Sequence, residues 1–198
     1  MKNVSVIIPT YNERENIEVL LPSVAKLLKK HSIKHEIIVV DDSSPDGTAD
    51  VAREMNKKYG TIRVLVRKKK SGIGSAVRDG YNTAKNDILL SIDSDLSFET
   101  GDIIRLLEKL DEGYDMVVAS RHAESGGYEA RNIGVKSKRF ISVYGNKITS
   151  LLTGIDIRDF SANFRAMKRP VWEAIETSDN TNSVLLEMIV AAHAKGFK

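Results

Sequence analysis

Short apolar runs alternate with segments of helical periodicity over the first 120 residues. The runs are rich in Val, Ile and Leu, and polar or turn-forming residues follow each of them. Runs of this kind predict strands that are buried on both faces of a sheet. The predicted strands are 4–8, 36–40, 62–66, 88–92 and 115–120.

The segments between these strands predict helices. The first carries apolar residues at helical spacing from Ile17 to Leu28. Asn12 with Glu15 three residues later predicts a capping box at its start, and Pro22 predicts a kink or an interruption. Further helices are predicted at about 48–59, 74–85 and 101–112.

Alternating strands and helices indicate an α/β fold, with a mainly parallel sheet and helices on both faces. Such sheets bind ligands at the carboxyl ends of their strands. Four strands end in distinctive polar stretches: PTYNE, DDSSPDGT, DSDLS and SRHAESGG. The alternation stops after residue 120, but no repeat or low-complexity linker divides the chain, so a single domain over residues 1–198 is expected.

The composition excludes several classes of protein. Of the 198 residues, 41% are hydrophobic and 29% are charged, which is typical of a soluble globular protein. The net charge of +3 does not indicate a nucleic-acid partner. Without cysteine, disulfides and thiolate metal sites are excluded. The N-terminal residues become polar too early for a secretory signal, and no apolar run approaches the roughly 18 residues of a membrane helix.

Two aspartates follow the predicted strand 88–92 with one residue between them. Asp93 and Asp95 would repel each other unless a positive group lay between them. Divalent cations such as Mg²⁺ and Mn²⁺ prefer oxygen ligands, usually one or two carboxylates together with substrate phosphates. The pair therefore predicts a cation that holds a diphosphate. The alternative is a solvated turn whose aspartates cap the next helix.

The second strand also ends in acidic residues. Asp42 in VVDDSSPDGT could accept hydrogen bonds from a ribose or a base, or could belong to an ordinary Asx turn. No G-x-G-x-x-G motif follows the first strand and no Walker A motif occurs, which disfavours a dinucleotide-binding dehydrogenase. KKKSGIGSA is basic and rich in glycine; it is a weak phosphate-loop signal, and the alternative is a flexible basic connection.

Six stretches occur in an order that resembles a known family. They are VSVIIPTYNERENI, EIIVVDDSSPDGT, SGIGSAVRDGYNTAK, IDSDLS, SRHAESGG and DFSANFRAMKR. Together they resemble family 2 glycosyltransferases of the GT-A fold, specifically the polyprenol-phosphate (dolichol-phosphate) mannose synthases. The resemblance covers essentially the whole chain. It implies inverting transfer of a sugar, with mannose favoured, from a nucleotide-diphosphate sugar such as GDP-mannose to a polyprenyl phosphate.

The resemblance implies roles for residues on the donor side. The nucleotide sugar would contact Pro9, Tyr11, Glu13, Val40, Asp42, Asp93 and Ser94. Asp93 and Asp95 would bind the cation, Mg²⁺ or Mn²⁺. The family usually has Gln two residues after the second Asp, where this chain has Ser97, so Ser97 or Glu99 is the expected replacement ligand.

The resemblance assigns the acceptor phosphate to four basic residues: Arg121, Lys138, Arg139 and Arg165. Arg121 is also expected to be catalytic, together with Asp93 and Asp95. The family's Ser-Gly before the Phe of the last stretch is replaced by Ala162-Asn163. Family members continue beyond the position of Lys198 with a strand and a basic segment, which this chain is expected to lack.

A phosphate acceptor needs no protein base, because the second pKa of a phosphate monoester is about 6 and the group is largely anionic near pH 7. A hydroxyl acceptor would need a general base, usually Asp or Glu. The Glu-Asp context of family 2 polysaccharide synthases is not found after residue 120. The alternatives are transfer to a saccharide hydroxyl, a sugar nucleotidyltransferase and a non-catalytic homologue.

Residues 135–152 combine an apolar helical face with several lysines and an arginine. This pattern fits the surface of an anionic membrane, and it equally fits a core helix with a solvated basic face. The expected location is the cytoplasm, at the cytoplasmic face of a membrane, held by the membrane surface or by a membrane subunit.

Overall fold

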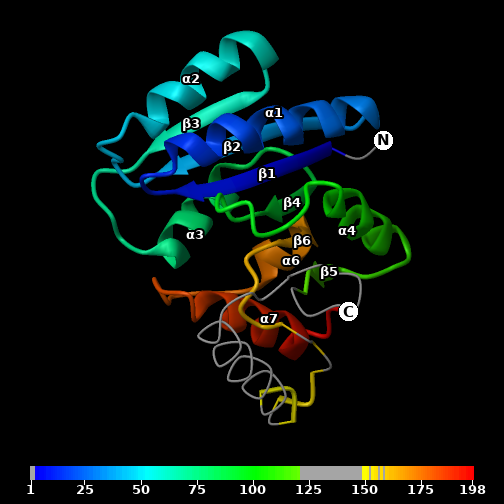
Figure 1. The fold of residues 1–198 in the computed structure, drawn as a ribbon. Helices are drawn as coiled ribbons and strands as arrows, with labels where there is room; N and C mark the ends of the chain where they lie inside the picture. Colours follow the sequence, from blue (N-terminus) through cyan, green and yellow to red (C-terminus); the bar gives the residue numbers. More distant parts are fainter. Residues whose placement is uncertain (1–2, 121–148, 152, 156, 158) are drawn as a thin grey trace, which may run out of the picture.

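The computed structural model describes residues 3–120, 149–151, 153–155, 157 and 159–198 (Figure 1). In chain order the elements are β1 (Asn3–Thr10), α1 (Arg14–Lys30), β2 (Lys34–Asp41), α2 (Thr48–Tyr59), β3 (Ile62–Val66), α3 (Ile73–Thr83), β4 (Ile88–Ser91), α4 (Asp102–Asp111), β5 (Met116–Val118), β6 (Arg165–Lys168), α6 (Arg169–Ala174) and α7 (Val184–Ala194). The five predicted strands and the four predicted helices before residue 120 are confirmed.

The strands form one six-stranded sheet in the order β3-β2-β1-β4-β6-β5. β1 lies inside the sheet and pairs in parallel with β2 and β4, for example through Val6 with Ile37 and with Leu90. β6 is antiparallel to both of its neighbours, β4 and β5. The expected mainly parallel sheet is therefore confirmed, with one antiparallel strand that the sequence did not predict.

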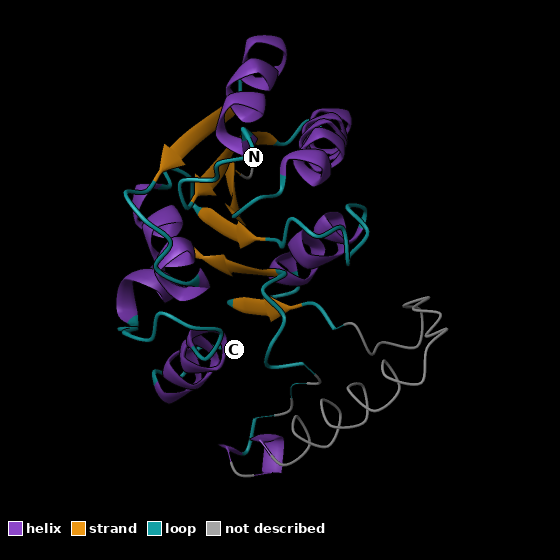
Figure 2. Ribbon diagram, turned by 60° about the vertical axis from the view of Figure 1, so that its left-hand side comes forward, coloured by secondary structure: helices purple, strands orange, loops and turns teal. Residues whose placement is uncertain are grey.

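Helices cover both faces of the sheet (Figure 2). Successive side chains of a strand point to opposite faces. Val6 and Ile8 accordingly pack in the cluster that contains apolar residues of α1, α2 and α4, whereas Ile7 packs in the cluster that contains those of α3, α6 and α7. Each Ile or Leu side chain buried in this way stabilises the folded state by about 1.5–3 kcal/mol. The sheet is thus packed between two layers of helices, and this packing holds the carboxyl ends of the parallel strands in place.

Helix α1 runs without a break through Pro22, so the expected interruption is wrong. Proline removes one helical hydrogen bond. Around it, however, the apolar side chains of Leu21, Val24 and Leu28 are completely buried against the sheet. This burial offsets the missing bond and keeps the helix continuous.

The start of α1 is held by the loop between β2 and α2, and the expected capping box does not form. The backbone N–H of Asn12 donates to Ser44 Oγ (2.9 Å), and that of Glu13 donates to Thr48 Oγ1 (3.1 Å). The N–H of Arg14 donates to an Asp46 carboxylate oxygen (3.1 Å). Side chains from a distant loop thus satisfy donors that a helix start leaves unpaired.

The start of α3 packs closely on the backbone of residues 179–181. The N–H of Gly74 donates to the carbonyl of Asn180 (3.0 Å), and Arg78 Nη1 donates to the carbonyl of Asp179 (2.6 Å). A Cβ atom on Gly74 would lie 2.4 Å from the Asp179 carbonyl oxygen. The carboxylate of Glu187 on α7 accepts the N–H of Asp179 (3.1 Å) and fixes this loop from its other side.

Candidate active site

The carboxyl ends of β1, β2 and β4 meet in a cleft of about 270 Å³. These strands are parallel neighbours, so the residues that follow them lie at one edge of the sheet. The cleft is lined by Pro9, Thr10, Tyr11, Glu13, Asp42, Lys70, Gly72, Ile73, Ala76, Asp93, Ser94 and Asp95. It brings together all the expected donor-side and cation residues except Val40 and the two alternative cation ligands, Ser97 and Glu99.

Val40 is completely buried and packs under α3, with a methyl group close to Gly80. Its side chain cannot contact a ligand in the cleft. The expected contact between Val40 and the nucleotide is therefore corrected to a packing role.

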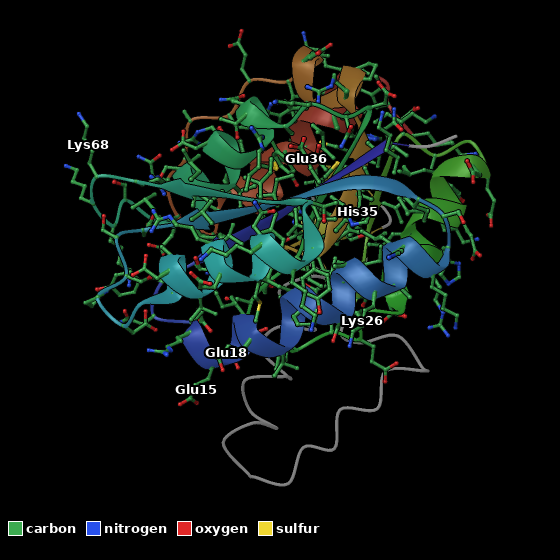
Figure 3. The ribbon with its side chains drawn as sticks, turned by 90° about the horizontal axis from the view of Figure 1, so that it is seen from above. Glu15, Glu18, Lys26, His35, Glu36 and Lys68 are labelled. Atoms are coloured by element: carbon green, nitrogen blue, oxygen red, sulfur yellow. The ribbon has the colours of Figure 1, made fainter. Side chains whose placement is uncertain are left out.

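Tyr11 lies at the rim of the cleft with its ring partly exposed. The ammonium nitrogen of Lys70 is 3.7 Å from the centre of this ring. A cation–π contact of this kind contributes about 0.5–1 kcal/mol at an exposed site. Lys70 comes from the basic, glycine-rich loop between β3 and α3, whose function the sequence indicated only weakly. Lys68 of the same loop points away from the body of the molecule (Figure 3).

Asp42 lies in the cleft with both carboxylate oxygens bonded. Arg67 Nη1 donates to Oδ1 (2.7 Å), and the backbone N–H of Ser71 donates to Oδ2 (3.2 Å). The Arg67 and Asp42 side chains are only 10% and 6% exposed, and Arg67 also pairs with Asp79 on α3 (3.0 Å). Sequence reasoning missed Arg67, whose only signal was its position directly after a predicted strand.

Asp41, the neighbour of Asp42, forms the Asx turn that was the alternative for this stretch. Its carboxylate accepts the backbone N–H of Ser44 (2.9 Å) and the Ser44 hydroxyl (2.6 Å). The Asx turn is therefore present at Asp41, whereas the contact of Asp42 with a nucleoside stays a prediction. Asp41 shapes the turn, and Asp42 faces the cleft.

Asp93 and Asp95 both line the cleft, on a turn that follows β4. Asp95 Oδ1 accepts the backbone N–H of Ser97 (3.0 Å), and Leu96 between them has a left-handed backbone with φ of 58°. Leucine rarely adopts this conformation. The alternative in which these aspartates cap the next helix is wrong, because α4 follows Gly101 and has no side-chain cap. Cation binding by Ser97 or Glu99 stays a prediction.

Three hydrogen bonds join α3, β4 and the segment before β6 beside this turn. The Tyr81 hydroxyl donates to Ser91 Oγ (2.7 Å), which donates to the backbone carbonyl of Asn163 (2.6 Å). Asn163 Nδ2 then donates to Asp93 Oδ1 (3.1 Å). Burial raises the pKa of Tyr81 to about 12, so its hydroxyl stays a neutral donor.

Arg165 is completely buried, and its expected contact with the acceptor phosphate is wrong. Its Nε donates to the carbonyl of Ala162 (3.1 Å), and Nη1 donates to that of Leu185 (2.7 Å). Burial lowers the pKa of Arg165 to about 10, while the negative charge of Tyr81 in its ionised form and those of Asp93 and Asp159 oppose this effect. Arg165 is therefore a structural cation that ties β6 to α7.

The other expected acceptor residues, Arg121, Lys138 and Arg139, lie outside the described residues, as does most of the segment 135–152. Their roles stay predictions. Glu187 on α7 anchors the loop of residues 178–179 through its carboxylate.

The donor set of the cleft fits a hard divalent cation. Within the described ranges, no cluster of three or more His, Cys, Asp or Glu residues could hold a metal ion. Two neighbouring carboxylates nevertheless suit a cation that takes its remaining ligands from a diphosphate and water. Asp95 is exposed at the cleft, and Asp93 accepts a hydrogen bond from Asn163. Asp93 and Asp95 are the residues that would hold it.

Residues 5–175 match the family model described as glycosyl transferase family 2. The chain belongs to glycosyl transferase family 2. A dolichol-phosphate mannosyltransferase from Pyrococcus furiosus is 35% identical over 189 residues, which cover 94% of this chain and 52% of the relative. A polyprenol monophosphomannose synthase from Mycolicibacterium smegmatis is 34% identical over 177 residues, or 87% of this chain and 64% of the relative. The expected family is confirmed, and this family 2 chain spans about half to two thirds of the length of these relatives.

Solved structures share the fold of this family 2 chain. One is glucosyl-3-phosphoglycerate synthase from Mycobacterium tuberculosis, solved in complex with Mn²⁺, UDP and phosphoglyceric acid. It superimposes with a TM-score of 0.76 at 19% identity, and the match covers 98% of this chain and 65% of the synthase chain. Mannosyl-3-phosphoglycerate synthase from Rubrobacter xylanophilus gives a TM-score of 0.65 at 22% identity, covering 88% and 56%. The GT-A type of α/β fold is thereby confirmed.

Proposed function

We propose that this chain is the catalytic region of a glycosyltransferase that moves mannose from GDP-mannose to a polyprenyl phosphate, with inversion. The observation that carries the proposal is that Tyr11 and Asp42, the proposed nucleoside side, line the same cleft as Asp93 and Asp95, the proposed cation side. The names of the two curated relatives support mannose as the sugar and a polyprenyl phosphate as the acceptor.

On the donor side the chain's task is binding and orientation. Asp42, held by Arg67, accepts hydrogen bonds from the nucleoside, and the Tyr11 ring contacts the nucleoside at the rim of the cleft. Asp93 and Asp95 hold Mg²⁺ or Mn²⁺. The cation, when bound, neutralises the charge that develops on the departing nucleoside diphosphate. Lys70 lies within the same cleft and adds positive charge near the diphosphate.

On the acceptor side no proton has to be removed. A phosphate monoester is anionic near pH 7, since its second pKa is about 6. One displacement at the anomeric carbon breaks its bond to the nucleoside diphosphate and forms the bond to the acceptor phosphate, so an α-linked donor gives a β-linked product. Arg121, Lys138 and Arg139 are proposed to bind that phosphate by charge.

A polyprenyl phosphate resides in a membrane, so the proposed location is the cytoplasmic face, on the membrane surface or on a membrane subunit. In the part of the chain that the structure describes, no helix has the length and apolarity to cross a membrane. Peripheral attachment is therefore the proposed arrangement.

The test is a transfer assay with GDP-mannose, Mn²⁺ and dolichyl phosphate in detergent. We expect a mannosyl-phosphate lipid, and Asp95→Asn should lower its rate on the order of 100-fold, as the loss of charge stabilisation does in other enzymes. Dolichol without its phosphate should not react. Transfer to dolichol or to a free saccharide would overturn the acceptor class. Binding of GDP and Mn²⁺ without transfer to any acceptor would favour a non-catalytic homologue.

A further inference from the structure

Asn163, one of the two positions at which the last family stretch departs from its usual sequence, lies beside the proposed cation side of the cleft. Its side chain is 1% exposed, and Nδ2 donates to Asp93 Oδ1 at 3.1 Å. The other half of the amide, Oδ1, is buried and has no hydrogen-bond partner among the described residues. Among the described residues, Nδ2 of Asn163 therefore has one acceptor, and this acceptor is a proposed cation ligand.

The backbone of Asn163 is fixed independently of this contact. The Ser91 hydroxyl donates to its carbonyl (2.6 Å), and Tyr81 donates to Ser91 in turn (2.7 Å). Because the last acceptor is a carbonyl, both hydroxyl protons have a defined direction. Ser91 is the last residue of β4 and Asp93 follows two residues later, so the network sets the position of Asn163 relative to the turn that carries Asp93.

A buried amide whose oxygen lacks a hydrogen bond destabilises the folded state compared with an apolar side chain of the same shape. Packing alone does not explain why an asparagine stands here, whereas a hydrogen bond to Asp93 does. The terminal torsion of an aspartate is broad and has no strongly preferred angle. One N–H bond to a carboxylate oxygen restricts that torsion.

We propose that Asn163 is a positioning residue that orients the Asp93 carboxylate for the cation. The inference rests on the proposed function, because it takes Asp93 as a cation ligand. Partners that orient metal ligands typically contribute about 10–100-fold to metal affinity or activity. Asn163 should accordingly change cation binding more than it changes the stability of the fold.

The experiment measures Mn²⁺ binding to the whole chain in the presence of GDP, and separately of UDP, from the electron paramagnetic resonance signal of free Mn²⁺. Two variants remove the donor: Asn163→Ala, and Asn163→Leu, which keeps the volume and also removes the unpaired oxygen. Asn86→Ala is the matched control. Asn86 Nδ2 donates to the carbonyl of Val4 (2.9 Å) just before β4 begins, at the other end of that strand from the cleft.

We expect about a 10-fold weaker Mn²⁺ affinity in both Asn163 variants. Asn86→Ala should leave it within twofold, and Asn163→Leu should keep the thermal midpoint of the wild type. Unchanged Mn²⁺ affinity in Asn163→Leu would overturn the positioning role, and so would an equal loss in Asn86→Ala. Binding that depends on Asp95 but not on Asn163 would overturn only this inference. Wild-type protein that binds no Mn²⁺ with either nucleotide would overturn the proposed function as well.

Discussion

Arg67 determines how Asp42 is presented to a ligand, because the two form a nearly buried ion pair. Removing one partner of such a pair leaves a charge unpaired and costs about 3–5 kcal/mol. Arg67→Ala should therefore lower the free energy of unfolding by about 3 kcal/mol and weaken GDP binding. Urea unfolding and a nucleotide titration measure the two effects.

Arg53→Ala is the matched control for this prediction. Arg53 pairs with Asp50 at 2.6 Å, but both side chains are more than half exposed. An exposed pair contributes about 0–1 kcal/mol. Similar losses of stability in the two variants would show that the burial of Arg67 has no special effect.

The residues that the sequence could identify are those that directly follow strands. Tyr11, Asp42, Asp93 and Asp95 belong to stretches whose position at the sheet edge follows from the alternation of strands and helices. Asn163 could not be identified, because its partner is 70 positions away in the sequence and nothing local indicates the contact. Arg165 was assigned to the acceptor by the family resemblance alone. A charged side chain usually lies at the surface, but in this fold Arg165 lies in the core.

At the scale of elements, the close approach of α3 to the loop at residue 180 restricts the glycines at the helix start. A Cβ on Gly74 would lie 2.4 Å from one backbone oxygen and 2.8 Å from another. Overpacking of this kind costs about 1–3 kcal/mol. Gly74→Ala should lower the free energy of unfolding by that amount, and it should also weaken nucleotide binding, since Gly72 and Ile73 line the cleft.

Gly101→Ala tests whether the close approach of backbone oxygens to Gly74 causes the loss of stability expected for Gly74→Ala. Gly101 immediately precedes α4, has a negative φ of −57°, and would place its Cβ in open space. We expect no loss of stability there. Equal unfolding midpoints for the Gly74 and Gly101 variants, followed by chemical denaturation, would contradict the role of the close approach.

The periodicity of the sequence was sufficient to predict every helix and strand up to β5, because each buried strand has its own apolar run. β6 was missed for a physical reason. Its sequence, Arg-Ala-Met-Lys, is short and ends in charged residues, and it is a strand only because β4 and β5 hold it on both sides. The start of α1 was mispredicted for a similar reason, since its hydrogen-bond partners come from another loop.

For the whole molecule, the alkaline limit of stability should depend on Tyr81. Burial raises its pKa from 10.0 to about 12, so the folded state keeps the hydroxyl protonated where the unfolded state loses the proton. This contribution is fully present below pH 10 and is lost as the pH rises through about 12. A difference of two pKa units corresponds to about 2–3 kcal/mol.

Tyr81→Phe should remove this pH dependence and should cost about 0.5–1.5 kcal/mol near pH 7 through the lost hydrogen bond. The measurement is the difference in unfolding free energy between wild type and variant at pH 8 to 12. Arg165 and Tyr81 interact through their charges, so the change in this difference between pH 10 and pH 12 reports on the pair, with the burial of Tyr81 as its largest cause. A constant difference between pH 10 and pH 12 would show that Tyr81 titrates normally.

The two loops on the proposed nucleoside side of the cleft are joined by hydrogen bonds from Asn12, Glu13 and Arg14 to the segment of residues 44–48. Neither loop is an independent module. A protein engineer who exchanged the β1–α1 loop for that of another transferase, to change the base it accepts, would leave side chains of the second loop without their backbone donors. The unit of exchange is therefore the pair of loops, and natural insertions or deletions in one should be accompanied by compensating changes in the other.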